Sequence, residues 1–278
     1  MRISISNIAW DTKDDEAVCS ILQRHHVDAI DIAPGKYFVD VATATADQIK
    51  KVRDWWAERG IEIIGMQSLL HGTQGLNLFD APEVQQRMLS HLSDVCRIGN
   101  GLNARRLVFG SPRNRDRRGL SDDQALEIAA LFFKCLADVA QQHDVTICLE
   151  PNPECYGSNF MTSSQETASV VKAVGHPALK MQFDTGALCI NGESPASVCA
   201  EFQHLIGHVH ASDPQLVPVG TGATDHYQAA AALREYLPDA SVTIEMLKRS
   251  VEDSLTAVEQ SVRYVSECYG NSSGTKSS

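Results

Sequence analysis

Short, β-branched apolar runs alternate along the chain with longer segments whose apolar residues recur at helical spacing. The runs that we predict to form strands span residues 3–8, 29–32, 62–67, 106–109, 145–150, 179–184, 208–211 and 241–246. Each run is followed by a segment of helical periodicity, as in residues 45–59 and 122–142. The pattern predicts strand–helix units that repeat in series from one end of the chain to the other.

Residue types that cap helices mark the ends of several predicted helices. Ser121 is followed three residues later by a glutamine, and residues 162–166 read Thr-Ser-Ser-Gln-Glu; both sequences are typical of helix starts. Gly60, Gly175 and Gly207 follow helical segments and predict helix ends, because glycine readily adopts the left-handed conformation that closes a helix.

The fold class follows from the strands. They are too apolar to face water, which favours a parallel sheet covered on both sides and closed on itself. An open doubly wound sheet is the alternative, but it would need a glycine-rich phosphate loop after the first strand, and residues 7–10 read Asn-Ile-Ala-Trp. We therefore predict a single-domain α/β protein, a (β/α)₈ TIM barrel over residues 1–270, with a disordered tail at 271–278.

Composition narrows the class of protein and its location. An apolar content of 43% is enough for a buried core, which excludes global disorder. The net charge of −11 predicts no nucleic-acid partner and no anionic membrane surface as partner. No apolar run approaches the roughly 20 residues that span a bilayer. The eight cysteines form no CxxC pair and no export signal is evident, so we expect a cytoplasmic protein.

Ionisable residues end the last four predicted strands: Glu150, Asp184, His210 and Glu245. A lone acid at a strand end is usually a helix cap or an ion-pair partner. Four such groups at equivalent positions of consecutive strands converge on the face where barrel active sites lie. Carboxylates with one imidazole suit one divalent ion, Mn²⁺, Mg²⁺ or Co²⁺, and the absence of thiolates argues against structural zinc.

Two histidines share the seventh strand and, being two residues apart, point to the same face. His210 is nearer the carboxyl end of the strand and is the better ligand candidate. We expect His208 one layer deeper, hydrogen-bonded in the core or supporting the ligands from behind.

The strand-end motifs LEPN (149–152), FDTG (183–186), HVHASD (208–213) and TIEM (243–246) resemble those of the xylose-isomerase-like TIM barrels. That superfamily includes ketose 3-epimerases, hydroxypyruvate isomerase, inosose dehydratase and repair endonucleases. The resemblance covers nearly the whole chain. It implies that Glu150, Asp184, His210 and Glu245 bind one divalent metal, commonly manganese, and that Glu150 and Glu245 are the catalytic acid and base.

Such a site suits removal of a proton next to a carbonyl, with the metal stabilising the enediolate. Proton return to the same carbon gives epimerisation and return to its neighbour gives isomerisation; the sequence leaves both open. Ala187 and Pro214–Leu216 stand where the epimerases carry a histidine and an arginine, which weighs against a free ketohexose as substrate. A metal-dependent dehydratase of a keto-polyol and a non-catalytic sugar-binding barrel are the alternatives.

A substrate-binding surface is predicted on the same face. Four arginines fall within residues 113–118, and Arg113 and Arg115 could grip a phosphate or carboxylate; a solvated loop with Asp116 as internal partner is the alternative. Further candidate substrate contacts are Trp10, Asp31, Gln67, His71, Asn152, Glu154, Asp213 and His226. The expected partner is a small carbohydrate that is neutral or anionic, and a homo-oligomer remains open.

Overall fold

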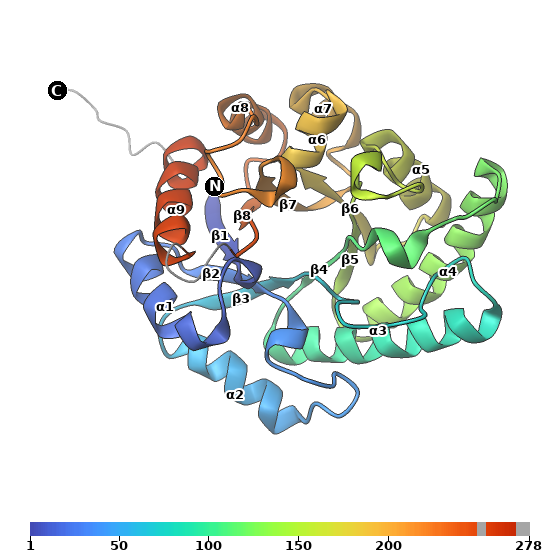
Figure 1. Ribbon diagram of the computed structural model, residues 1–278, viewed down its shortest axis with the longest axis horizontal. Coiled ribbons are helices and arrows are strands. Elements are labelled where there is room, and N and C mark those ends of the chain that lie inside the picture. The colour runs from blue at the N-terminus through green and yellow to red at the C-terminus, as the bar shows by residue number, and fades with distance from the viewer. Residues whose placement is uncertain (249–253, 271–278) are drawn as a thin grey trace.

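Eight parallel strands form a closed barrel at the centre of the computed structural model, which describes residues 1–248 and 254–270 (Figure 1). In chain order they are β1 (Arg2–Ser6), β2 (Ala29–Ile32), β3 (Glu62–Met66), β4 (Arg106–Phe109), β5 (Thr146–Leu149), β6 (Leu179–Asp184), β7 (Ile206–Ser212) and β8 (Ser241–Glu245). Each strand pairs with the next, and β8 pairs with β1 to close the ring. The predicted single-domain (β/α)₈ barrel is confirmed. The tail predicted at 271–278 lies outside the described residues.

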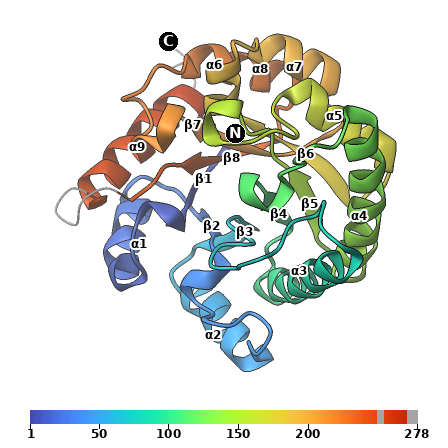
Figure 2. The ribbon, with the colours of Figure 1, turned by 45° about the vertical axis from the view of Figure 1, so that its right-hand side comes forward.

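Helices surround the barrel as an outer layer (Figure 2). They are α1 (Asp15–Arg24), α2 (Ala46–Ala57), α3 (Pro82–Leu102), α4 (Asp122–Gln142), α5 (Ser164–Val174), α6 (Thr185–Asn191), α7 (Pro195–Phe202), α8 (His226–Tyr236) and α9 (Ser254–Tyr269). Short 3-10 helices lie in the loops that leave the carboxyl ends of the strands: η1 (Asn7–Ala9), η2 (Thr12–Asp14), η3 (Pro34–Lys36), η4 (Pro112–Arg115), η5 (Glu154–Tyr156) and η6 (Pro214–Leu216).

Capping explains most of the helix boundaries. Ser121 begins α4 with a capping box, in which its side chain accepts from the backbone of Gln124 and the Gln124 side chain accepts in return. Gly175 ends α5 in the left-handed conformation, as predicted. The helix end predicted at Gly207 is wrong, because α7 stops at Phe202 and Gly207 lies inside β7. A Cβ at Gly207 would come within 2.6 Å of the Lys180 Cβ, so a close approach of β6 and β7 requires this glycine.

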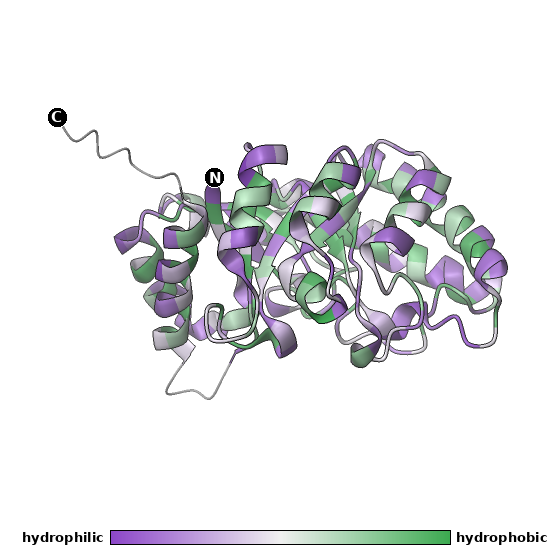
Figure 3. Ribbon diagram, turned by 90° about the horizontal axis from the view of Figure 1, so that it is seen from above, coloured by the Kyte–Doolittle hydropathy of each residue, from purple (hydrophilic) through white to green (hydrophobic). Residues whose placement is uncertain are grey.

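The core fills both the interior of the barrel and the space between strands and helices, so most side chains on both faces of the strands are buried. In Figure 3 the central strands are largely green, whereas the surrounding helices carry both green and purple segments. Between β4 and α4, for example, Phe109 meets Phe133 edge to face, with ring centroids 5.3 Å apart. Among the helices that the structure describes, none is long and apolar enough to cross a membrane. Polar side chains are buried at the carboxyl ends of β5 to β8. The candidate site lies at these strand ends.

Candidate metal centre and substrate cavity

Four side chains from the last four strands meet at the carboxyl end of the barrel. They are Glu150, Asp184, His210 and Glu245, and each offers one ligand atom within 4.8 Å of the others. The His210 Nδ1 lies 3.2 Å from Glu245 Oε2, 3.4 Å from Glu150 Oε1 and 4.0 Å from Asp184 Oδ2. The structure therefore brings together the four residues that the sequence singled out as ligands.

The ends of the strands place these groups, and small neighbours leave room for them. Asp184 is the last residue of β6 and also caps α6, since its Oδ1 accepts from the backbone N–H of Ala187 at 2.6 Å. Glu150 directly follows β5. A Cβ on Gly110 would come within 1.9 Å of Glu150 Oε2, so only glycine at position 110 allows this carboxylate its place.

Neighbouring polar side chains orient each carboxylate of the cluster. Gln67 Nε2 donates to Glu245 Oε1 at 2.7 Å. Asn152 Nδ2 donates to Glu150 Oε2 at 3.0 Å. The Ser212 Oγ lies 2.9 Å and 3.0 Å from the two oxygens of Asp184. Ser212 was not singled out from the sequence, although it lies inside the HVHASD motif.

The cluster places three carboxyl groups beside a single imidazole, so its negative charge exceeds its positive charge. Burial, with the nearby carboxylates of Glu245 and Glu150, raises the pKa of Asp184 to about 8. Burial alone would lower the pKa of His210, but the same two glutamates outweigh it and raise that pKa well above its usual value. Glu150 Oε1 is buried and has no hydrogen-bond partner among the described residues. Three hard oxygen donors and one imidazole nitrogen that converge in this way fit a divalent cation.

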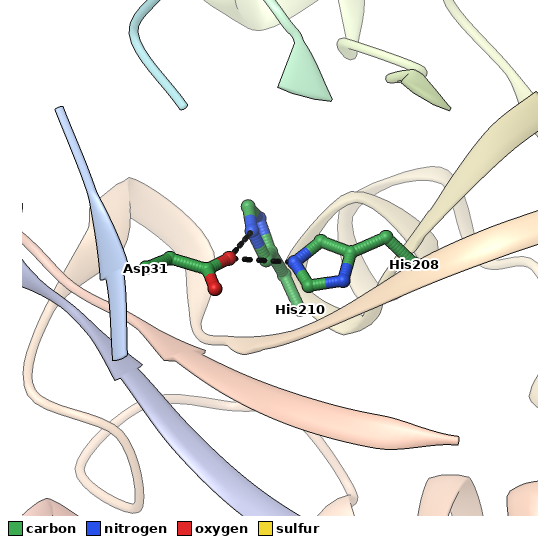
Figure 4. A group of neighbouring side chains, drawn as sticks. All are labelled: Asp31, His208 and His210. Carbon is green, nitrogen blue, oxygen red and sulfur yellow. Dashed lines mark hydrogen bonds and ion pairs between the residues drawn. The ribbon is translucent and has the colours of Figure 1, made fainter. Parts of the chain in front are cut away.

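A second buried group lies behind the cluster (Figure 4). His208 Nε2 is 2.6 Å from Asp31 Oδ2, and His210 Nε2 is 3.9 Å from the same oxygen. His210 thus turns Nε2 toward Asp31 and leaves Nδ1 for the three carboxylates. A Cβ on Gly65 would come within 2.5 Å of Asp31 Oδ1, so Gly65 makes room for this carboxylate. His208 lies one layer deeper, where the sequence suggested it, and Asp31 contacts His208 instead of the cavity.

A cavity of about 440 Å³ opens next to the four ligand candidates. Glu150, Asp184 and Glu245 line it. Five of the predicted substrate contacts also line it, from the loops after β3, β4, β5 and β7: Gln67, His71, Arg113, Asn152 and Asp213. The volume is in the range of small-molecule sites.

The other predicted substrate contacts lie away from this cavity. Trp10 is buried, and its Nε1 donates to Asp15 at 2.7 Å. Arg115 is also buried and donates from Nη1 to the Glu150 carbonyl at 2.7 Å, so it supports the backbone that presents Glu150. His226 Nδ1 lies 2.8 Å from the Tyr269 hydroxyl, and Glu154 is exposed in η5. The sequence locates these residues on the correct loops, but it does not indicate which way each side chain turns.

Two loops that nothing in the sequence places together form one wall of the cavity. The Tyr156 hydroxyl of η5 accepts from the backbone N–H of Gln215 in η6 at 2.7 Å, and both residues line the cavity. Gln215 and Leu216 have positive backbone φ angles of 58° and 50°, which residues other than glycine rarely adopt. Strained conformations of this kind collect at functional sites, where the surrounding structure holds them in place.

Similar solved structures share the whole barrel. The D-psicose 3-epimerase from Clostridium cellulolyticum, solved with D-tagatose, has a TM-score of 0.81 at 16% identity and covers 97% of this chain and 99% of its own. The 3-keto-D-glucoside 4-epimerase from E. coli has a TM-score of 0.80 at 17% identity, with 96% and 100% covered. The D-allulose 3-epimerase from Methylomonas sp. has a TM-score of 0.76 at 16% identity, with 97% of each chain covered. At these identities the likeness shows the fold.

A sequence search of curated proteins found no match. The family model described as xylose isomerase-like TIM barrel matches residues 20–268, which is most of the chain. This match agrees with the closed barrel and with the strand-end motifs that carry the four clustered residues. The chain belongs to the xylose isomerase-like TIM barrel family.

Proposed function

We propose that the protein is a divalent-metal-dependent isomerase or epimerase of a carbohydrate. The observation that carries this proposal is the convergence of Glu150 and Glu245, two buried carboxylates that line one cavity, on His210 and Asp184. The structural neighbours described as sugar epimerases support the substrate class. The ligands suit Mn²⁺ first and Mg²⁺ or Co²⁺ as alternatives.

A divalent ion held by the four residues would supply positive charge beside the carbonyl and hydroxyl oxygens of the substrate. Asp184 and His210 serve only to hold it. Asp184 is fixed by the Ser212 hydroxyl and the Ala187 N–H, and the Asp31 carboxylate lies 3.9 Å behind the His210 ring as its charged neighbour. These contacts keep the ligands in place before substrate arrives, so little reorganisation accompanies the reaction.

Glu150 and Glu245 move the proton. One glutamate, as a carboxylate, removes the proton from the carbon next to the carbonyl. For epimerisation the other glutamate, as a carboxylic acid, donates its own proton to the opposite side of that carbon. For isomerisation a proton is instead delivered to the neighbouring carbon, and a hydroxyl proton is relayed from one oxygen to the other. Each glutamate turns one oxygen toward His210 and has the other held by an amide N–H, from Asn152 or Gln67. These two amide contacts fix the direction in which each carboxyl group faces the cavity.

Deuterium exchange tests the proposal directly. Purified protein is stripped of metal, reloaded with Mn²⁺ and incubated in D₂O with a panel of ketoses, sugar acids and sugar phosphates. Deuterium at the carbon next to the carbonyl, dependent on the metal, supports the proposal. Exchange that ends in loss of water would reassign the protein as a dehydratase. Tight carbohydrate binding without exchange or turnover anywhere in the panel would make it a sugar-binding barrel.

A further inference from the structure

The polar side chains at the floor of the cavity are already engaged. Those nearest the candidate metal centre each bond one of its carboxylates: Gln67, Asn152 and Ser212. Asp213 is held by backbone N–H groups of Gly220 and Thr224. These groups orient the protein itself, so a substrate must find its remaining polar contacts elsewhere in the cavity.

Arg113 is the exception among the arginines of its loop. Arg117 pairs with Asp122, and Arg118 pairs with Asp80 at 2.8 Å. Arg115 turns inward to the Glu150 carbonyl. Arg113 lines the cavity, is exposed, and has no side-chain hydrogen bond or ion pair within the described parts of the chain. The loop therefore presents one guanidinium to the cavity with its donors unused.

The surroundings of Arg113 favour an anion there. His71, from the loop after β3, lines the same cavity and has no side-chain partner among the described residues. Apolar side chains form much of the cavity wall, Leu69, Leu70 and Phe109 among them. The acidic residues that line the cavity belong to the metal cluster or, as Asp213, to the loop before α8. Among the described residues that line the cavity, Arg113 is the only arginine or lysine.

We propose that Arg113 binds an anionic group, a phosphate or a carboxylate, on the part of the substrate remote from the reacting carbons. The carbohydrate portion of this inference rests on the proposed function. The planar guanidinium fork matches both anions with two parallel hydrogen bonds. In a protein with a net charge of −11, an unpaired arginine at the cavity also offsets the long-range repulsion of an incoming anion.

Binding of substrate analogues that lack a carbonyl separates this inference from catalysis. Sorbitol, sorbitol 6-phosphate and gluconate are titrated into the Mn²⁺-loaded protein by calorimetry, with inorganic phosphate as a fourth ligand. We expect one or both anionic polyols to bind at least about 10-fold more tightly than sorbitol, because a charge-assisted bidentate contact contributes that much. The phosphate and carboxylate arms identify which anion is preferred. Equal affinity for sorbitol and both anions would overturn the inference.

The variant Arg113→Gln assigns the effect to this side chain. It should remove the preference for the anion, whereas the matched variant Arg118→Gln, whose arginine pairs with Asp80, should keep it. An anionic preference that survives in Arg113→Gln would show that the anion binds elsewhere, for instance at the metal, and would also overturn the inference. Deuterium exchange on neutral ketoses is scored separately. The proposed function can thus stand when this inference fails, and the affinity data remain decisive when no exchange is seen.

Discussion

At the end of β8, Glu245 lies between an amide donor and an imidazole, and the change Glu245→Gln probes its role. Glutamine keeps the size of the side chain and can still accept from Gln67, so the fold should be retained. It cannot take up a proton, so we expect solvent exchange to fall about 10²–10⁴-fold. Deuterium incorporation measures this loss. The matched change Glu201→Gln, at an exposed position of α7, should leave exchange intact. Wild-type exchange in Glu245→Gln would exclude Glu245 as acid or base.

Gly65 offers a second test at the residue scale. In Gly65→Ala the new Cβ would meet Asp31 Oδ1 at 2.5 Å, so the carboxylate that contacts His208 must shift from its place. We expect a loss of about 1–3 kcal/mol in the free energy of unfolding, measured by denaturant titration. Mn²⁺ affinity, measured by calorimetry, should fall about 10–100-fold because the carboxylate behind His210 is displaced.

The control for that prediction is Gly35→Ala, since a Cβ there meets nothing within 4 Å. Its stability and metal affinity should stay close to those of the wild type. If Gly65→Ala behaves like Gly35→Ala, the Asp31 carboxylate is not needed to hold His210 in place.

The sequence was most informative about residues whose role follows from position along a strand. Glu150, Asp184 and Glu245 end apolar runs, and strand ends in a barrel share one face, so their meeting could be predicted. Side-chain direction in the loops could not be predicted, because it depends on packing between segments far apart in the chain. Trp10, for example, turns to Asp15 in the core, and Gly65 is needed only because Asp31 occupies the space beside it.

Among the elements, the bounds of several strands were predicted more closely than the breaks between helices. The predicted bounds of β2, β4 and β6 agree with the structure, while β7 begins at Ile206, two residues before the predicted start. Gly207 obscured that start because glycine is also typical of helix ends. The segment after β6 forms two helices where one amphipathic segment was expected. Gly192 closes α6 in the left-handed conformation, and Ser194 caps α7, so local signals for the break were present.

The loop between β7 and α8 depends on one buried carboxylate, and this dependence predicts an effect of pH. Burial alone would raise the pKa of Asp213, but the His226 imidazole 3.5 Å away and hydrogen bonds from the backbone N–H groups of Thr224 and Gly220 outweigh it and lower that pKa to about 2. A carboxyl group with a depressed folded-state pKa stabilises the fold above its unfolded pKa of about 3.9. The stabilisation is lost as pH falls toward 2.

The change Asp213→Asn should therefore lower the free energy of unfolding by about 1–2 kcal/mol at pH 7, after allowance for solvent screening. Denaturant unfolding of metal-free wild type and variant at several pH values measures the difference. The difference in unfolding free energy between wild type and variant should narrow steadily between about pH 4 and pH 2, where the wild-type carboxylate becomes protonated and loses its charge. A gap that stays constant down to pH 2 would mean that the charge of Asp213 contributes nothing.

For the molecule as a whole, the candidate metal centre ties together four consecutive strands. Its ligands come from the ends of β5, β6, β7 and β8, which form one side of the closed barrel, while Gln67 from the loop after β3 reaches across to Glu245. An ion that binds only the folded arrangement must stabilise the entire barrel, since unfolding separates its ligands.

Removing the metal and adding it back should therefore change the melting temperature of the whole barrel. At a free Mn²⁺ concentration of 100 times its Kd, binding should add about 2.7 kcal/mol, or roughly 5–10 °C in Tm for a chain of this size. Calorimetric melting of chelator-treated protein, with and without Mn²⁺, measures the rise. The variant Asp184→Asn should lose most of it, because a ligand charge is gone, whereas Asp123→Asn, at an exposed position of α4, should show it in full. Because the ion links the barrel through Asp184, a rise of equal size in both variants would mean that Mn²⁺ binds at some other place on the surface.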